Sequence, residues 1–306
     1  KFNFDFPHED LPIENLRDFS NTLKQNIKYK FIPLKIYYKY RAYKYAKNTT
    51  PELNIISTIS DKTKVSLDIG ANLGLFTYFM SRCSKKVFAF EPNPYPLRYL
   101  KYVVDDNVEI VPIAVGNLDG ITQLRIPKNR KGWSSNGASI TNVELNQGIE
   151  YDVSIHKIDT LEIENIGLIK IDVEGAELEV LNGALNTLNA QKPNLIIENE
   201  LVHSDKPEIL FKFMKKINYN AFYVDENKDL KKLEDNFDIL KNQNKPANKR
   251  FGYIQNFIFM HDERLQKTAY WLASYISFTF SKLMLLIDSS DLGTSGSLSI
   301  GTIRSV

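Results

Sequence analysis

The feature that most constrains the fold is a strand, a glycine-rich turn, a helix and a second strand that ends in an acid. The first three elements lie in VSLDIGANLGLFTYF, residues 65–79, and the second strand lies in VFAFEPNP, residues 87–94. Gly70 and Gly74 bracket a turn at which the backbone bends sharply and a ligand approaches without meeting a Cβ atom. This order of elements indicates a site for a cofactor that contains adenosine.

The spacing of the turn narrows the class of cofactor. A dinucleotide fingerprint requires G-x-G-x-x-G, and glycine stands only at Gly70 and Gly74 here, so that fingerprint fails. Glu91 closes the second strand, where a carboxylate accepts hydrogen bonds from both hydroxyls of a ribose, and Pro92 ends the strand. The alternative is an ordinary βαβ unit with a structural turn and a solvated Glu91. The turn and the acid together favour the cofactor site.

Four segments of the chain resemble the FkbM family of S-adenosylmethionine-dependent methyltransferases. They are VSLDIGANLGLFT, FAFEPNP, LIKIDVEGAELEVL (168–181) and LIIE (195–198). The resemblance runs from about Asn54 to His261 and is most specific at DIGAN and KIDVEGAE. It implies an α/β, Rossmann-like class I methyltransferase fold and methyl transfer, usually to a hydroxyl oxygen. It also implies a frequent association with sugar, glycolipid or polyketide tailoring.

The resemblance and the turn together predict how the chain binds S-adenosyl-L-methionine. The expected residues lie in the turn, at the carboxyl ends of strands and just beyond them. They are Asp68, Gly70, Ala71, Asn72, Gly74, Phe76, Glu91, Pro92, Asn93, Ala114 and Asp172.

Composition sets the class of protein. A chain of 306 residues with 43% hydrophobic and 25% charged residues can bury a full α/β core. A net charge of +2 argues against an enzyme that binds nucleic acid through a globally basic surface. Cys83 is the single cysteine, which excludes a disulfide within the chain and a cysteine-based zinc cluster. The start of the sequence has no apolar signal-peptide core, so we expect a cytoplasmic protein.

The pattern along the chain predicts four regions. Residues 1–50 form a helical N-terminal extension, with helical periodicity over about 11–48 that is interrupted near Pro33. Residues 51–263 form the methyltransferase domain, in which strands alternate with helices, and this alternation indicates a mostly parallel sheet with helices on both faces. Seven strands are expected, at 64–69, 86–91, 108–115, 167–172, 194–199, 221–225 and 253–260.

The last two regions are an apolar helix at 264–288 and a flexible tail at 289–306. The segment 268–287 reaches the ~20 residues of a membrane span, but it contains Lys282 and many hydroxyls, which favours packing or peripheral membrane contact. The N-terminal helix, rich in Lys and Tyr, either covers one face of the domain or engages an acidic membrane surface or an anionic glycan.

A long insertion follows the third expected strand. Residues 122–159 alternate in polarity, which suggests an added β-ribbon pair around the polar turn KGWSSNG. Trp133 and Ser135 of this turn are candidates for a lid that binds a sugar, because an indole stacks on an apolar ring face while a hydroxyl reads polar groups. The alternative is a tryptophan that anchors the loop to the body of the domain.

The fourth expected strand places a charge where an apolar residue is usual. Lys170 and Asp172 are two apart and so point to one face of a central strand. A buried ammonium needs a carboxylate partner, and Asp68 or Asp172 is the natural candidate. Lys170 is therefore either one half of a structural ion pair or a substrate-binding residue.

Candidate catalytic residues lie at the carboxyl edge of the sheet. Removal of the proton of an acceptor hydroxyl requires a base within hydrogen-bond reach. The candidates are Asp172, Glu174, Glu198 and His203, and Glu200 is a further substrate-binding candidate. Glu174, together with Glu177, also fits a structural role at a helix N-terminus. These acids could gather magnesium, but no dense carboxylate motif is present, so we predict no metal.

The resemblance implies an O-methyltransferase that acts on a hydroxyl of a sugar or glycan precursor. Two alternatives stay open. One is a methyltransferase for a lipid or polyketide hydroxyl, and the other is a catalytically silent module that binds nucleosides or membranes. The expected partner is a small-molecule or glycan acceptor, without nucleic acid.

Overall fold

A computed structural model describes most of the chain. The described residues are 33–48, 50–129, 132–133, 138–141, 148–199, 208–225, 227–233 and 254–266. The chain divides into two compact units, residues 1–261 and 262–306. The second unit is described only at 262–266, and the architecture below is that of the first unit.

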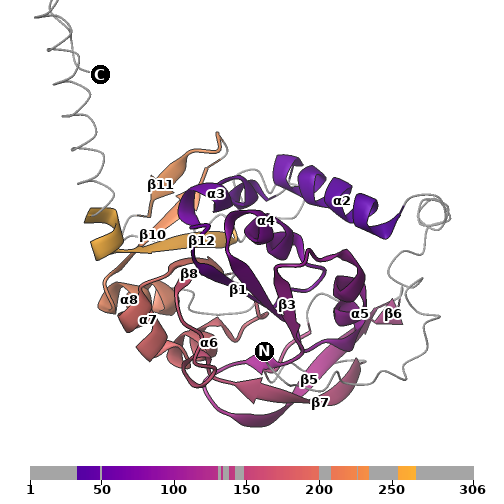
Figure 1. The fold of residues 1–306 in the computed structure, drawn as a ribbon. Helices are drawn as coiled ribbons and strands as arrows, with labels where there is room; N and C mark the ends of the chain where they lie inside the picture. Colours follow the sequence, from indigo (N-terminus) through magenta and orange to yellow (C-terminus); the bar gives the residue numbers. More distant parts are fainter. Residues whose placement is uncertain are drawn as a thin grey trace, which may run out of the picture. The chain divides into compact units, whose positions relative to one another are not determined.

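The first unit is built on a sheet with the strand order β11-β10-β12-β9-β8-β1-β2-β3 (Figure 1). Its strands are β1 (Val65–Ile69), β2 (Lys86–Phe90), β3 (Val108–Val111), β8 (Ile166–Ile171), β9 (Asn194–Glu198), β10 (Tyr219–Val224), β11 (Leu230–Lys232) and β12 (Asn256–His261). Strands β3, β2, β1, β8 and β9 pair in parallel, whereas β12 is antiparallel to both β9 and β10. When β11 and β12 are left aside, the six remaining strands can be numbered by their place in the chain. From β3 to β10, their order across the sheet is then 3-2-1-4-5-6, which is the order of a doubly wound, Rossmann-like sheet.

This sheet confirms the expected architecture and corrects its details. It has eight strands among the described residues instead of seven, because the short edge strand β11 pairs antiparallel with β10. The expected third strand, 108–115, is two strands. Pro112 separates β3 from β4 (Ala114–Val115), and β4 belongs to a second sheet. Proline lacks a backbone N–H, so the ladder of β3 cannot continue through it.

Helices cover both faces of the large sheet, as predicted. One face carries α2 (Leu34–Asn48), η2 (Pro51–Asn54), α3 (Ile56–Ile59), α4 (Leu75–Cys83) and α5 (Pro94–Val103). The other face carries α6 (Glu177–Asn182), α7 (Leu185–Gln191) and α8 (Glu208–Lys216). β8 is buried along its whole length, with Leu168 facing the α4 side and Ile169 facing the α6 side. This alternation is the period of two of a strand with a helix layer on each face.

The insertion forms the second sheet, with the order β4-β7-β5-β6. It joins β4, β5 (Gly120–Asn129), β6 (Gly132–Trp133) and β7 (Gly148–His156). Strands β5 and β7 pair antiparallel from Gly120–Ile155 to Pro127–Gly148, which confirms the expected β-ribbon. Leu124 and Val153 are buried on its inner face. The ribbon therefore has a small core of its own.

Predictions for the two ends of the chain lie largely outside the described residues. The apolar segment 268–287 and the tail 289–306 are among them. None of the described helices combines the length and the apolar run that a membrane crossing needs. The N-terminal helix is described from Leu34, directly after Pro33, and the buried Tyr38, Ala42 and Ala46 line its packed side.

Gly183, which caps the C-terminus of α6, tests the packing of this helix against the second sheet. A Cβ atom at this position would lie 1.9 Å from the carbonyl oxygen of Gly116, which follows β4. Backbone cannot move aside as a side chain can, so Gly183→Ala is expected to lower the free energy of unfolding by ~2–3 kcal/mol. Asn182→Ala, at an exposed neighbour, is the control and should change it by less than ~0.5 kcal/mol. Equal denaturant midpoints for the two variants would show that the close approach is relieved at no cost.

Candidate active site

The glycine turn joins β1 to α4 and is held tightly by its neighbours. The amides of Gly70 and Ala71 both donate to the carbonyl oxygen of Phe90, at 3.0 Å each. Gly70 has a φ of 78°, and a Cβ atom there would lie 1.8 Å from the carbonyl oxygen of Asp172. A side chain at Gly70 is therefore excluded by the end of β8 as well as by a ligand. Gly74 has the same φ and caps α4.

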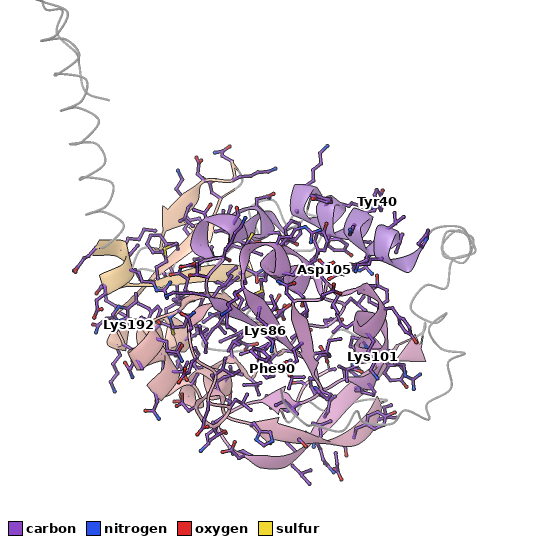
Figure 2. The ribbon with its side chains drawn as sticks, in the orientation of Figure 1. Tyr40, Lys86, Phe90, Lys101, Asp105 and Lys192 are labelled. Atoms are coloured by element: carbon purple, nitrogen blue, oxygen red, sulfur yellow. The ribbon has the colours of Figure 1, made fainter. Side chains whose placement is uncertain are left out.

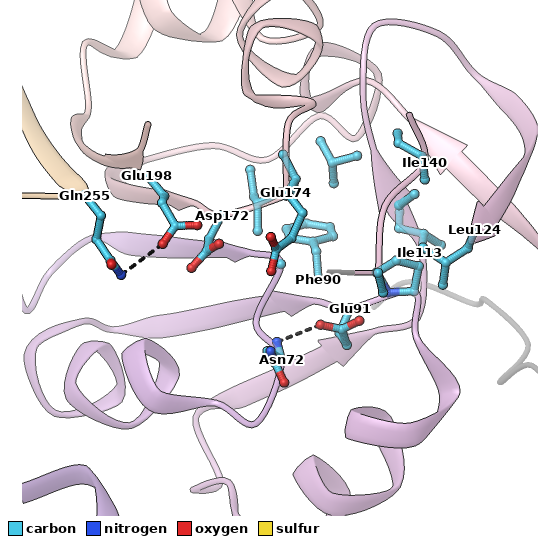
Figure 3. Close-up of a pocket in the computed structure, with 17 residues that line it drawn as sticks. Asn72, Phe90, Glu91, Ile113, Leu124, Ile140, Asp172, Glu174, Glu198 and Gln255 are labelled. Atoms are coloured by element: carbon cyan, nitrogen blue, oxygen red, sulfur yellow. Dashed lines mark hydrogen bonds between the residues drawn. The ribbon is translucent and has the colours of Figure 1, made fainter. Parts of the chain in front are cut away.

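Glu91 lies directly after β2 and is 6% exposed. Its Oε2 accepts a hydrogen bond from the amide of Asn72 at 2.6 Å, marked in Figure 3. Its Oε1 accepts one from the amide of Asn93 at 2.8 Å. Burial raises the pKa of Glu91 to about 7, against the lowering effect of these two amides. The turn and the acid are thus one unit, because Asn72 of the turn orients the carboxylate.

A first cavity of about 240 Å³ opens beside Glu91. Its wall is apolar toward the second sheet and polar toward the carboxyl ends of β8 and β9 (Figure 3). The apolar wall includes Phe90, Ile113, Ala114, Leu124 and Ile140, and the polar wall includes Asn72, Glu91, Asp172, Glu174, Glu198 and Gln255. An apolar slot beside a fixed carboxylate suits a flat base attached to a ribose.

A second cavity of about 250 Å³ lies between α2 and the glycine turn. Its α2 wall is formed by Tyr38, Arg41, Ala42 and Tyr45, and its other walls include Thr50, Asp68, Phe76 and Asn256. Gly70, Asn72, Asp172 and Gln255 line both cavities. The two cavities therefore adjoin at the turn and the end of β8.

Lys170 lies beneath this junction and is fully buried. Its Nζ lies 3.2 Å from Oδ2 of Asp172, donates to the carbonyl oxygen of Ile171 at 3.0 Å and stands 4.8 Å from the centre of the Phe76 ring. Lys170 lines neither cavity. These contacts are those of a buried ion pair with Asp172 as the partner, and the substrate-binding role of Lys170 stays a prediction.

Two more buried carboxyl groups lie near Lys170. Asp68 accepts a hydrogen bond from the hydroxyl of Thr77 at 2.5 Å, and burial raises the pKa of Asp68 to about 6. Burial likewise raises the pKa of Glu52 to about 7, although the positive charge of Lys170 acts in the opposite direction. Each carboxyl group pays a desolvation penalty that a single buried lysine offsets only in part.

The remaining catalytic candidates separate into different roles. Oε1 of Glu198 accepts a hydrogen bond from Nε2 of Gln255 at 3.0 Å, and both residues line the first cavity (Figure 3). Glu174 also lines it and has a φ of 54°. Glu177 instead accepts hydrogen bonds from the amides of Val173 and Gly175, which is the structural role at the helix start.

The structure brings most of the predicted cofactor residues to the two cavities. Nine of the eleven line one or both: Asp68, Gly70, Ala71, Asn72, Phe76, Glu91, Pro92, Ala114 and Asp172. Gly74 and Asn93 line neither cavity, and each caps the N-terminus of a helix beside the site. Gly74 caps α4. Asn93 caps α5, where its Oδ1 accepts a hydrogen bond from the amide of Tyr95.

Some predicted residues cannot be placed. Ser135, Glu200 and His203 lie outside the described residues, and Trp133 is described only as backbone in β6. Within the described residues, no group of three His, Cys, Asp or Glu side chains is arranged to hold a metal ion.

Sequence reasoning missed the contribution of α2, η2 and the start of β12. The residues concerned are Arg41, Tyr45, Thr50, Glu52, Gln255 and Asn256. The periodicity of α2 does not say which face meets a ligand. The sequence did hold one signal. The polar pair QN at 255–256 directly precedes the apolar run FIFM, which indicates polar side chains at the start of a buried strand.

Comparisons with known proteins agree with this geometry. A family model described as the methyltransferase FkbM domain matches residues 68–222. The hexuronic acid methyltransferase AglP of Haloferax volcanii is 29% identical over 141 residues, which cover 45% of this chain and 56% of that protein. Methyltransferase sdnD of Sordaria araneosa is 26% identical over 178 aligned residues, covering 47% of this chain and 69% of that protein. The chain thus spans little more than half the length of the first of these relatives.

A solved structure also resembles the chain. Methyltransferase FkbM from Methylobacillus flagellatus aligns with a TM-score of 0.41 and 16% identity, over 67% of this chain and 48% of that one. The fold assignment rests on the strand order described above.

The raised pKa of Glu52 predicts a pH dependence of stability. In the unfolded chain a glutamate loses its proton near pH 4.5, whereas folded Glu52 keeps it up to about pH 7. The folded state binds more protons in this window, so the contribution of Glu52 destabilises the protein as pH rises through it. Glu52→Gln should therefore raise the free energy of unfolding by ~1–3 kcal/mol at pH 8 and leave it nearly unchanged at pH 4.5.

Denaturant unfolding of both proteins at the two pH values measures this difference. Asp68 and Glu91 are present in both proteins, so the comparison isolates Glu52. Glu164→Gln, at an exposed position, controls for the loss of one carboxylate. A gain that is the same at both pH values would contradict the assignment.

Proposed function

This chain belongs to the FkbM methyltransferase family, and we propose that it transfers a methyl group from S-adenosylmethionine to a hydroxyl of a sugar or glycan precursor. The observation that carries the proposal is the unit of glycine turn and Glu91, in which the turn lies at the junction of the two cavities and Glu91 lines the first. The cofactor would supply an electrophilic methyl carbon on a sulfonium, and the sulfur would depart as a neutral thioether when the acceptor oxygen takes the methyl group. The protein has to hold the cofactor, align an acceptor oxygen and take up its proton.

The residues of the first cavity fit an adenosine. Glu91 is held by two backbone amides, and the lone pairs that they leave free can accept from the two hydroxyls of a ribose. Phe90, Ile113 and Leu124 supply the apolar surface that a base requires. Gly70 and Asn72 would border the sulfonium, because they line both cavities.

Glu198 is the best-placed proton acceptor among the described candidates. The carboxylate of Asp172 already has an ion-pair partner in the fold, because its Oδ2 lies 3.2 Å from Nζ of Lys170. The Glu198 carboxylate is oriented by Gln255, which lines both cavities and so stands where they adjoin. In this proposal Glu198 accepts the hydroxyl proton as the oxygen takes the methyl group.

A sugar acceptor is supported by family membership and by the relative named as a hexuronic acid methyltransferase. The direct test is incubation with S-adenosylmethionine that carries a labelled methyl group and with panels of hexoses, hexuronic acids and nucleotide sugars. Mass spectrometry should find a methyl ether on a sugar hydroxyl. Transfer only to lipid or polyketide hydroxyls would overturn the acceptor class, and no transfer despite tight cofactor binding would favour a silent module.

Glu91→Gln tests the cofactor assignment. The amide keeps the shape of the side chain but cannot accept at both positions, so affinity for S-adenosylmethionine should fall roughly tenfold to a hundredfold. Titration calorimetry measures the affinity, and Glu150→Gln on the outer surface of β7 is the control. An unchanged affinity in Glu91→Gln would remove Glu91 from the cofactor site.

Glu198→Gln tests the proton acceptor. With a sugar substrate in hand, kcat should fall by roughly a factor of 10² to 10⁴, while affinity for S-adenosylmethionine stays within about twofold. Glu174→Gln is the matched comparison, because Glu174 is a carboxylate that lines the same cavity. A larger loss of kcat in Glu174→Gln than in Glu198→Gln would transfer the role to Glu174.

A further inference from the structure

The second cavity has a charge pattern that the adenosine site does not explain. Its α2 wall presents the guanidinium of Arg41, and its opposite wall presents Asp68 and Asp172 at the ends of β1 and β8. A cavity with a cation on one side and carboxylates on the other complements a zwitterion. The amino-acid end of S-adenosylmethionine is such a group.

Arg41 is available to bind an anion. No carboxylate among the described residues lies within ion-pair distance of it, whereas Lys35 and Arg82 both pair with Asp105, which is labelled in Figure 2. Its guanidinium stands 5.5 Å from the centre of the Tyr45 ring, and Tyr45 lines the same cavity. A guanidinium keeps its charge at every working pH and offers a planar fork that matches a carboxylate.

The far wall offers an acceptor for a cation. Asn256 is 2% exposed, and its Oδ1 has no hydrogen-bond partner among the described residues. A buried amide oxygen without a partner costs free energy, and a ligand ammonium in the second cavity would satisfy it. Asn256 and Arg41 thus give one cavity an acceptor for an ammonium group and a donor for a carboxylate.

The position of α2 is fixed relative to the glycine turn. The hydroxyl of Tyr38 donates to the carbonyl oxygen of Gly74, and its ring packs edge-on against Tyr78 and Tyr99, with centroids 5.4 Å and 6.0 Å away. Arg41 lies three residues after Tyr38, on the same side of the helix. The contact with the turn therefore places Arg41 on the cavity wall.

We propose that Arg41 binds the α-carboxylate of S-adenosylmethionine, so that the N-terminal helix is part of the cofactor site. The inference rests on the proposed function. It also accounts for the adjoining cavities, because a cofactor with adenosine at Glu91 must place its amino-acid end beyond Gly70 and Asp172. The helix is then a determinant of cofactor affinity as well as a cover for the sheet.

The test compares S-adenosylmethionine with its decarboxylated analogue, which keeps the adenosine, the sulfonium and the amine. Titration calorimetry gives the ratio of the two affinities for the full chain and for Arg41→Gln. The natural protein should prefer the carboxylate-bearing ligand, and Arg41→Gln should reduce this preference roughly tenfold to a hundredfold, almost entirely through weaker binding of S-adenosylmethionine. Lys44→Gln, at an exposed position of the same helix, should leave the ratio unchanged.

Each other outcome overturns the proposal in a recognisable way. An unchanged ratio in Arg41→Gln, with tight binding of both ligands, removes Arg41 from the cofactor site and leaves the proposed function intact. An unchanged ratio together with a raised KM for hexuronic acids assigns Arg41 to the carboxylate of the acceptor. Failure of the natural protein to bind either ligand removes the proposed function as well. Thermal unfolding of each variant establishes that it is folded.

Discussion

The site depends on the close approach between the glycine turn and the end of β8. Gly70 leaves no room for a Cβ atom against the carbonyl of Asp172, and the amide of Asp172 donates to Ile69 at 3.0 Å. The same turn bonds to Phe90 at the end of β2. Three strands are therefore tied together at their carboxyl ends, and the part of the wall that both cavities share is set by contacts between backbone atoms.

The tight packing around the site also buries charged side chains. Lys170, Asp68 and Glu52 lie in the layer beneath the cavities, away from bulk water. Burial raises the pKa of Asp68 to about 6 and that of Glu52 to about 7, so Glu52 changes its charge close to neutral pH. The ion pair of Lys170 with Asp172 connects this layer to the wall that both cavities share.

How far the sequence predicts the molecule differs from element to element. The turn, Glu91 and β8 follow from local patterns, because glycines, an acid and a period of two leave few alternatives. Pro112 was a readable break in the third strand, yet the apolar residues on either side favoured a single strand. Arg41 and Asn256 could not be assigned to a site, because helix docking and strand insertion bring these two residues, more than 200 positions apart, to the lining of one cavity.

The insertion of β12 between β9 and β10 has a consequence for how the protein is made. Strands β1, β2 and β3 can pair as soon as they are synthesised, but β10 joins the sheet only through β12. Gln255 and Asn256 arrive with the same strand and complete the wall of the second cavity. On the ribosome, therefore, a nascent chain that ends before residue 256 exposes the edge of β9 and lacks part of the site, and ligand binding reports the final step of sheet assembly.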